Sequence, residues 1–174
     1  MKIIYERKTE TFLFFLRGIF SNFQRASFTY RGNKFANTEQ AFMWCKATFF
    51  KDDITAEKIL KETNPAAAKK LGREVSNYID SKWDKVRESY MYEVNTCKYS
   101  QNKELKDQLL KTKNLILVEV NPRDRIWGIG LSADDDRILN TNNWKGKNLL
   151  GKVLMQIRKE LASEENKQTV KLGE

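Results

Sequence analysis

Residues 115–120 read Leu-Ile-Leu-Val-Glu-Val, an apolar run broken only by Glu119 and stopped by Asn121-Pro122. A run of this length and composition predicts a β-strand buried on both faces. Residues 12–16 predict a second short buried strand. Gly32, between residues 27–30 and 34–36, predicts the turn of a hairpin. The expected strands are few and short, so helices must supply most of the fold.

Helical periodicity covers much of the remaining chain. We expect helices at residues 39–50 with Thr38 as N-cap, at 54–62 with Asp53 as N-cap, from Pro65 to Gly72, at 80–99, at 103–111, and after Asn148 as N-cap. The segment 80–99 is the clearest, because its apolar residues recur every three or four positions and form one stripe. The sequence therefore predicts a helix-rich α+β fold, a compact single domain with a few short N-terminal and central strands. We place this domain at residues 1–162 and a polar, frayed tail at 163–174.

Composition limits the chemistry available to these 174 residues, which is the length of one ordinary domain. The chain has no histidine, which excludes the Ser-His-Asp triad, the Cys-His pair and the His-Glu-x-x-His zinc site. Two cysteines, Cys45 and Cys97, are too few for a zinc knuckle or a disulfide scaffold. We therefore expect no metal site, and an acid, base or nucleophile drawn from Asp, Glu, Lys, Tyr, Ser, Thr or Cys.

Positive charge is a second constraint, this time on partners. Lys and Arg number 32 against 23 Asp and Glu, which gives a formal net charge of +9. Such a surplus favours nucleic acid or phosphorylated ligands, although solubility alone explains it equally well. No apolar run approaches the length of a transmembrane helix, and residues 12–16 lack a signal-peptide cleavage site. We expect a soluble cytoplasmic protein without a membrane partner.

Polar residues that the core pattern leaves unexplained mark candidate chemistry. Glu39 and Lys46 lie seven residues apart and project from nearly the same side of the predicted helix, among aromatic residues. They form either an acid/base or nucleophile pair, or a surface ion pair that stabilises the helix. Glu119, a carboxylate near the end of an apolar strand, needs an Arg partner or a function.

Two glycine-containing stretches are further candidates. In Asp124-Arg125-Ile126-Trp127-Gly128-Ile129-Gly130, glycine permits close approach to a ligand and the tryptophan offers a flat face for a base; a tight turn with a core tryptophan is the alternative. Lys145, Lys147 and the expected helix start at Asn148 suit phosphate, or form a solvated turn.

A series of short motifs resembles the NADAR family, also called the YbiA-like family. The matching motifs, in chain order, are Ser21-Asn22-Phe23, Glu39-Gln40, Lys46-Ala47, Ala68-Lys69, Leu71-Gly72-Arg73, Trp83, Met91, Lys98, Gln101-Asn102, Leu110, Thr112, Glu119, Asp124, Ile126-Trp127-Gly128-Ile129-Gly130, Trp144, Gly146, Asn148, Gly151, Leu154-Met155 and Arg158. The resemblance extends from about Phe14 to Arg158, and it implies the compact, helix-rich YbiA-like fold.

The resemblance implies an N-glycosidase that cleaves a bond between a ribosyl carbon and a nitrogen without a cofactor. Two substrate classes are associated with the family: ADP-ribose attached to guanine in DNA or nucleotides, and phosphorylated ribosylamino-pyrimidine intermediates of riboflavin synthesis. We favour ADP-ribosylated guanine because the net charge attracts DNA. A non-catalytic module that binds ADP-ribose or nucleic acid is the alternative from a different class.

The family motifs also suggest roles for individual residues. Glu39 or Asp124 would stabilise the positive charge that builds on the sugar. Lys46 would attack the anomeric carbon as a Schiff-base nucleophile or, as a second choice, protonate the leaving base. The predicted catalytic residues are Lys46, Glu39 and Asp124, and the predicted substrate-binding residues are Asn22, Phe23, Arg73, Trp83, Glu119, Trp127, Gly128 and Asn148.

Overall fold

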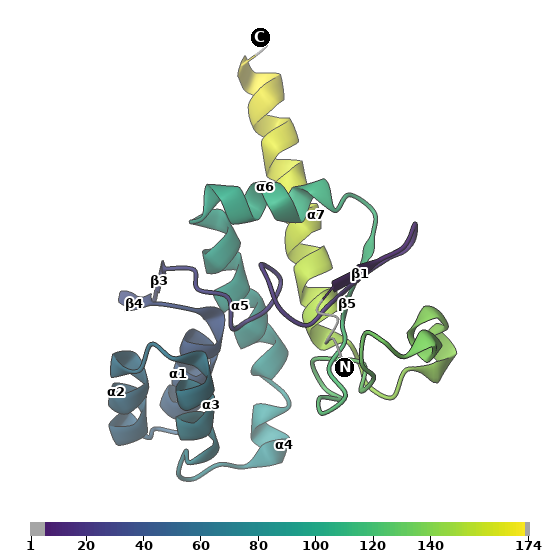
Figure 1. Cartoon of the computed structure of the whole chain (residues 1–174). Coiled ribbons are helices and arrows are strands. Elements are labelled where there is room, and N and C mark those ends of the chain that lie inside the picture. Colours follow the sequence, from purple (N-terminus) through teal and green to yellow (C-terminus); the bar gives the residue numbers. More distant parts are fainter. Residues whose placement is uncertain (1–5, 173–174) are drawn as a thin grey trace. The chain divides into compact units, whose positions relative to one another are not determined.

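Helices form most of the computed structural model, which describes the backbone of residues 6–172 and the side chains of residues 6–165 (Figure 1). The strands are β1 (Glu6–Lys8), β2 (Phe12–Phe15), β3 (Phe28–Tyr30), β4 (Asn33–Phe35) and β5 (Ile116–Glu119). The α-helices are α1 (Thr38–Phe49), α2 (Asp53–Lys61), α3 (Pro65–Arg73), α4 (Asp80–Trp83), α5 (Arg87–Ser100), α6 (Lys103–Lys111) and α7 (Leu149–Leu172). The predicted helix-rich α+β fold class is confirmed.

These elements group into two compact units, which are described separately below. The sheet unit contains residues 6–21 and 104–172, and the helical unit contains residues 22–103. Two short 3-10 helices, Asp136–Leu139 and Thr141–Asn143, belong to the sheet unit.

The sheet unit is built on three strands in the order β1-β2-β5. Strand β2 runs parallel to β5, with Phe12 opposite Ile116 and Phe15 opposite Glu119, and β1 runs antiparallel to β2. Leu117 and Val118 point to opposite faces of β5 and both are fully buried. The prediction of a strand covered on both faces is therefore confirmed.

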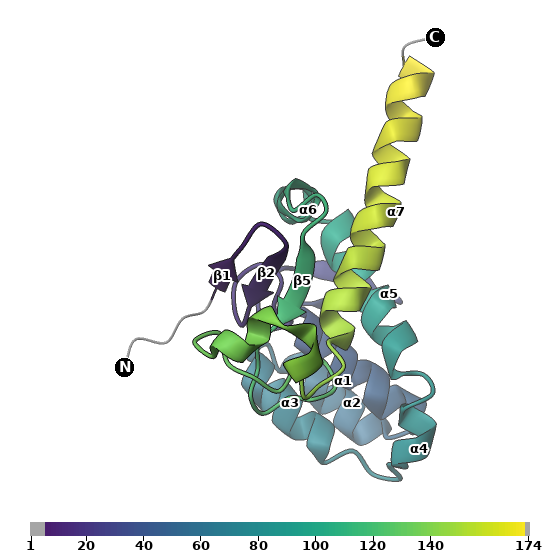
Figure 2. The same ribbon diagram turned by 90° about the vertical axis from the view of Figure 1, so that its right-hand side faces the viewer.

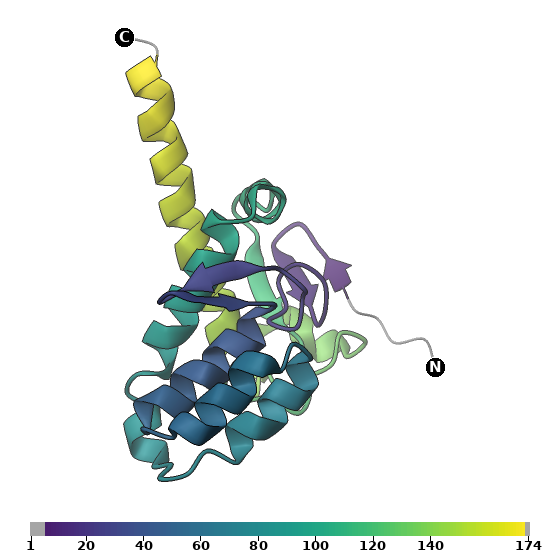
Figure 3. The same cartoon turned by 90° about the vertical axis from the view of Figure 1, so that its left-hand side faces the viewer.

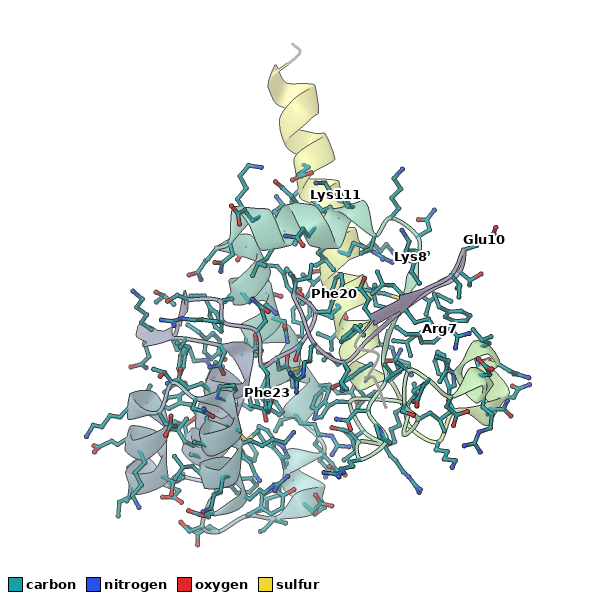
Figure 4. All side chains as sticks on the ribbon, in the orientation of Figure 1. Arg7, Lys8, Glu10, Phe20, Phe23 and Lys111 are labelled. Carbon is teal, nitrogen blue, oxygen red and sulfur yellow. The ribbon has the colours of Figure 1, made fainter. Side chains whose placement is uncertain are left out.

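Helix α7 packs along β5 in the sheet unit (Figure 2). Its buried side is apolar, with Leu150, Leu154 and Ile157 each at most 1% exposed. The helix continues to Leu172, through the segment 163–172 for which the sequence predicts a polar tail. On β1 the side chains of Arg7 and Lys8 leave the strand on opposite faces (Figure 4), and Arg7 pairs with Asp136 at 2.9 Å.

In the helical unit α1, α2 and α3 lie side by side, with the β3–β4 hairpin nearby (Figure 3). The hairpin turns at Arg31 and Gly32, as predicted, and both residues have positive φ. Asn64 is the N-cap of α3, as the Asn64-Pro65 pair predicts. The expected caps Thr38 and Asp53 are each wrong by one residue, because the preceding side chains reach the first turn instead. The N-cap of α1 is Asn37, whose side chain accepts a hydrogen bond from Gln40 N. The N-cap of α2 is Asp52, whose side chain accepts one from Thr55 N.

Two helix ends in this unit differ from the prediction. Gly72 does not end α3 but lies inside it, where a Cβ would overlap the Met43 sulfur of α1. Glycine therefore allows α1 and α3 to approach closely. The predicted helix at 80–99 is broken at residues 84–86. On a continuous helix Trp83 and Tyr90 would be about 10 Å apart along the axis, whereas the break lets their rings stack with centroids 5.6 Å apart.

No described helix combines the length and the apolar character that crossing a membrane requires.

Candidate functional site

Lys46, on α1, has a half-buried side chain whose amine is held by groups without charge. Nζ donates a 2.8 Å hydrogen bond to the carbonyl oxygen of Gly72 at the end of α3. The same atom lies 3.9 Å from the centre of the Tyr78 ring, a cation–π distance. Burial lowers the pKa of Lys46, Asp80 raises it and Arg73 lowers it. A lowered pKa favours the neutral, nucleophilic form of an amine.

Glu39 begins a second cluster, two turns earlier on α1. Its side chain is only 6% exposed, and Oε1 lies 3.7 Å from the Lys69 ammonium of α3. Lys69 is also positioned over the Phe23 ring, 5.6 Å from its centre. Phe23 itself is 42% exposed (labelled in Figure 4) and can offer its ring to a ligand. The cluster thus joins a buried carboxylate, a cation and an accessible aromatic face.

Asn22 contacts the backbone of this cluster. Its backbone carbonyl accepts from the Glu39 N–H at 3.0 Å, and its side chain is 8% exposed. Asn22 Nδ2 donates to the Met91 sulfur at 3.3 Å, and Asn22 Oδ1 accepts from Asn95 Nδ2 at 3.3 Å. Asn22 therefore fixes the start of α1, the element that carries Glu39 and Lys46.

The spacing argument for Glu39 and Lys46 holds in one respect. Both side chains contact α3, Glu39 through Lys69 and Lys46 through Gly72, so they share the α3-facing side of α1. Each has its own partners, however, and seven residues of helix separate them by about 10 Å along the axis. The two side chains therefore contact α3 at different points.

Arg73 and Trp83 take different positions in the helical unit. Arg73 is exposed at the end of α3 and lowers the pKa of Lys46 through its charge. Trp83 is 5% exposed and packs against aromatic rings, among them Phe42 at 5.3 Å and Tyr90 at 5.6 Å. Its face is covered by these rings, so its contacts are those of a core residue.

In the sheet unit, Asp124 organises a turn. Its Oδ1 accepts from the backbone N–H groups of Ile126 at 2.9 Å and Trp127 at 2.8 Å. Gly128 follows in a tightly packed stretch, where a Cβ would lie 2.9 Å from the Glu119 carbonyl oxygen. Asp124 and Gly128 thus shape the loop that presents Trp127, whose side chain is half-buried.

Asn148 connects the same loop region to β5. Asn148 is only 2% exposed. Its Oδ1 accepts from Glu119 N at 3.0 Å, and its Nδ2 donates to the Leu117 carbonyl at 2.9 Å. Asn148 directly precedes α7, where the sequence predicts the start of this helix, and both of its side-chain amide atoms bond to β5. Glu119 ends β5 with a half-buried side chain.

The sequence assigns no role to the Lys69 ammonium beside Glu39, nor to the Gly72 carbonyl and the Tyr78 ring that contact Lys46. The sequence also assigns no role to Lys98 on α5, which is fully buried and whose pKa is lowered by burial to about 7. Its spacing from Met91 and Val94, on the buried side of α5, is the signal that could have identified it. Among the described residues, no group of three or more Cys, Asp or Glu side chains is placed to bind a metal ion.

Comparisons with known proteins show the family to which the chain belongs. The NADAR domain family model matches residues 12–162. Protein irg-1 of Caenorhabditis elegans is 38% identical over 176 residues, covering 91% of this chain and 83% of that protein. N-glycosidase R617 of Acanthamoeba polyphaga mimivirus is 43% identical over 127 residues, covering 73% and 75%. N-glycosidase YbiA of Escherichia coli K12 is 33% identical over 147 residues, covering 84% and 83%.

Structural similarity points to the same family. The NMR structure of the Escherichia coli protein YbiA matches with a TM-score of 0.74 and 30% identity, covering 93% of this chain and 91% of that one. The YbiA-like fold that the motifs imply is confirmed by this match. Family model, relatives and fold converge, and the chain belongs to the NADAR domain family.

Proposed function

We propose that the N-glycosidase activity of this chain releases ADP-ribose from modified guanine in DNA or nucleotides, and that Lys46 is the nucleophile. The activity rests on the family and on relatives named N-glycosidases. The observation that carries the assignment of Lys46 is its amine, which is half-buried, has a lowered pKa and is oriented by a carbonyl and an aromatic ring.

The chemistry requires a neutral amine. The Lys46 lone pair forms a bond to the anomeric carbon, and the carbon–nitrogen bond to guanine breaks while the base takes up a proton. The sugar ring then opens, the ring oxygen becomes a hydroxyl, and an imine joins Lys46 to the sugar. Water adds to the imine carbon and releases the sugar and the amine. Burial supports this route because it disfavours the ammonium form.

Glu39 supplies the negative charge in this proposal. Positive charge builds on the sugar as the bond to the base breaks, and a nearby carboxylate stabilises that transition state. The Lys69 ammonium lies 3.7 Å from this carboxylate. Asp124 is the second carboxylate proposed for this role, and its Oδ1 accepts a hydrogen bond from the backbone N–H of Trp127.

Positive charge supports this choice of substrate. Lys69, Lys70 and Arg73 place three cations along the last turns of α3, beside both clusters. Together with the net charge of +9 they favour a polyanion such as DNA carrying ADP-ribose. Phe23 supports the same choice because its exposed ring can stack on a base.

The test compares wild type with Lys46→Ala, Lys46→Arg and Glu39→Gln on an oligonucleotide that carries ADP-ribose on guanine. Free ADP-ribose is measured by mass spectrometry, and borohydride is added in a parallel reaction to trap the imine. We expect release and a trapped adduct with wild type only, and folded variants by circular dichroism. Near-normal turnover by Lys46→Ala would eliminate the Schiff-base route.

Two other results would redirect the assignment of substrate and activity. Tight binding of the modified oligonucleotide without release would favour the non-catalytic reader. Release from phosphorylated ribosylamino-pyrimidines, with no action on ADP-ribosylated guanine, would instead identify the riboflavin intermediates as the substrate.

A further inference from the structure

The loop between α3 and α4 covers the Lys46 amine. Tyr78, in this loop, is 40% exposed, yet its ring face lies against Lys46 Nζ and its edge packs on Phe50 with centroids 5.3 Å apart. The Gly72 carbonyl contacts the same amine from α3. The amine is therefore held between a ring and a carbonyl, neither of which carries a charge.

The loop is held in place from the junction of α1 and α2. The buried Asp52 carboxylate accepts from Ser76 N at 2.8 Å and from Ser76 Oγ at 2.7 Å, while it also caps α2. Asn77 then turns the chain with a positive φ of 57°, a conformation that asparagine tolerates well. This anchoring fixes where Tyr78 enters the space beside Lys46.

The hydroxyl of Tyr78 has a separate contact. It donates a 2.6 Å hydrogen bond to Asp80 Oδ1 at the start of α4. Asp80 is also the group whose charge attracts the Lys46 ammonium and raises its pKa, against Arg73, which lowers it. Asp84 and Arg87 form an ion pair at 2.6 Å, and they shift the pKa of Tyr78 in opposite directions: Asp84 raises it and Arg87 lowers it. The tyrosine hydroxyl thus binds the carboxylate whose charge attracts the Lys46 ammonium.

We propose that Tyr78 is a positioning residue for Lys46: its ring holds the amine against the Gly72 carbonyl, and its hydroxyl holds the Asp80 carboxylate away from the amine. This inference rests on the proposed function, in which Lys46 is the reacting group. An Asp80 side chain without its hydrogen bond is free to pair with the ammonium, and such a pair favours the unreactive charged form. The ring also excludes water from the amine.

The test measures the Lys46 amine directly and needs no substrate. Reductive methylation with formaldehyde and cyanoborohydride is followed at Lys46 by peptide mass spectrometry between pH 6 and pH 10. The variants are Tyr78→Phe, which keeps the ring, Tyr78→Leu, which keeps only apolar bulk, Asp80→Asn, and the double variant Tyr78→Phe/Asp80→Asn. Ile79→Ala is the matched control, because Ile79 is the exposed neighbour in the same loop.

We expect Tyr78→Phe to slow methylation of Lys46 at pH 7 about threefold, which corresponds to a rise in its pKa of roughly half a unit. The rate should return to that of wild type in the double variant, where the freed side chain carries no charge. Tyr78→Leu should change the rate too, because the amine loses the ring face, and Ile79→Ala should not. In turnover, Tyr78→Phe should lower kcat and leave KM unchanged.

Two results separate this inference from the proposed function. If Lys46→Ala abolishes glycosidase turnover while both Tyr78 variants methylate at the wild-type rate, the inference is overturned and the proposed function stands. If the Tyr78 variants alter the amine as expected while Lys46→Ala retains turnover, the positioning of the amine is supported and its catalytic role fails. Slowing that persists in the double variant overturns the role assigned to the hydroxyl.

Discussion

Replacing Asn148 with alanine separates a structural role of this side chain from the binding role that the family motif suggests. The amide contacts the β5 backbone twice, through Glu119 N at 3.0 Å and the Leu117 carbonyl at 2.9 Å. Asn148 also has a φ of 52°, a conformation that alanine adopts only at a cost. The substitution therefore removes two hydrogen bonds and adds backbone strain.

The magnitude follows from these two effects. Each backbone group left without its partner costs about 1–3 kcal/mol, and we take the low end, about 1 kcal/mol, for both. The left-handed conformation adds roughly 1 kcal/mol for alanine. The free energy of unfolding should thus fall by about 3 kcal/mol, which corresponds to a Tm lower by roughly 6–12 °C for a chain of this size.

Urea unfolding followed by circular dichroism measures this loss, with turnover measured on the folded variant at low temperature. Asn148→Gly should recover about 1 kcal/mol relative to alanine, because glycine adopts positive φ without strain. Asn143→Ala is the control, since Asn143 is exposed in the neighbouring 3-10 helix. A loss below about 0.5 kcal/mol for Asn148→Ala, with turnover abolished, would refute the structural reasoning and support direct substrate binding.

Three further substitutions test contacts elsewhere in the fold. Gly151→Ala should lower the unfolding free energy by about 1–2 kcal/mol, because a Cβ there would overlap the backbone oxygen of Leu117 and this outweighs the gain in helix propensity; urea unfolding showing increased stability would contradict it. The hydrogen bonds from Ser76 and Thr55 hold the pKa of the Asp52 carboxyl well below its usual range. The ionised carboxylate therefore stabilises the folded protein above about pH 4, and this contribution is lost as the pH falls further. Thermal melts should show Asp52→Asn to be less stable than wild type at pH 6 and to approach wild type by about pH 2. Arg158→Met should cost about 1–2 kcal/mol, since it leaves the Leu115 carbonyl without the 2.8 Å bond from Nη1, and equal stability of the two proteins would argue against that bond.

Local sequence signals predicted the elements well where the signal was itself local. The run at 115–120, the turn at Gly32 and the Asn64-Pro65 helix start depend on propensities of a few adjacent residues, and all three are confirmed. The break at residues 84–86 carries no such signal, because the periodicity of 80–99 continues through it. Ring stacking between Trp83 and Tyr90 favours the break, and that contact exists only in the folded protein.

The candidate site shows the same division. Helical spacing correctly placed Glu39 and Lys46 on one side of α1. It gave no indication of Tyr78, because a loop residue meets Lys46 only after α3 has packed on α1 and Asp52 has anchored the loop. The substrate-binding role of Trp83 stays a prediction, and the structure places its side chain among core rings.

The sequence by itself determined the fold class, the family, the absence of histidine chemistry and the shared helix face of Glu39 and Lys46. These properties depend on composition, on periodicity and on residues adjacent in the chain. Only the tertiary structure decided that the Lys46 amine meets the Gly72 carbonyl and the Tyr78 ring, and that both amide atoms of Asn148 bond β5. The reason is that a side chain's pKa and hydrogen bonds depend on burial and on partners from distant segments, which packing alone brings together.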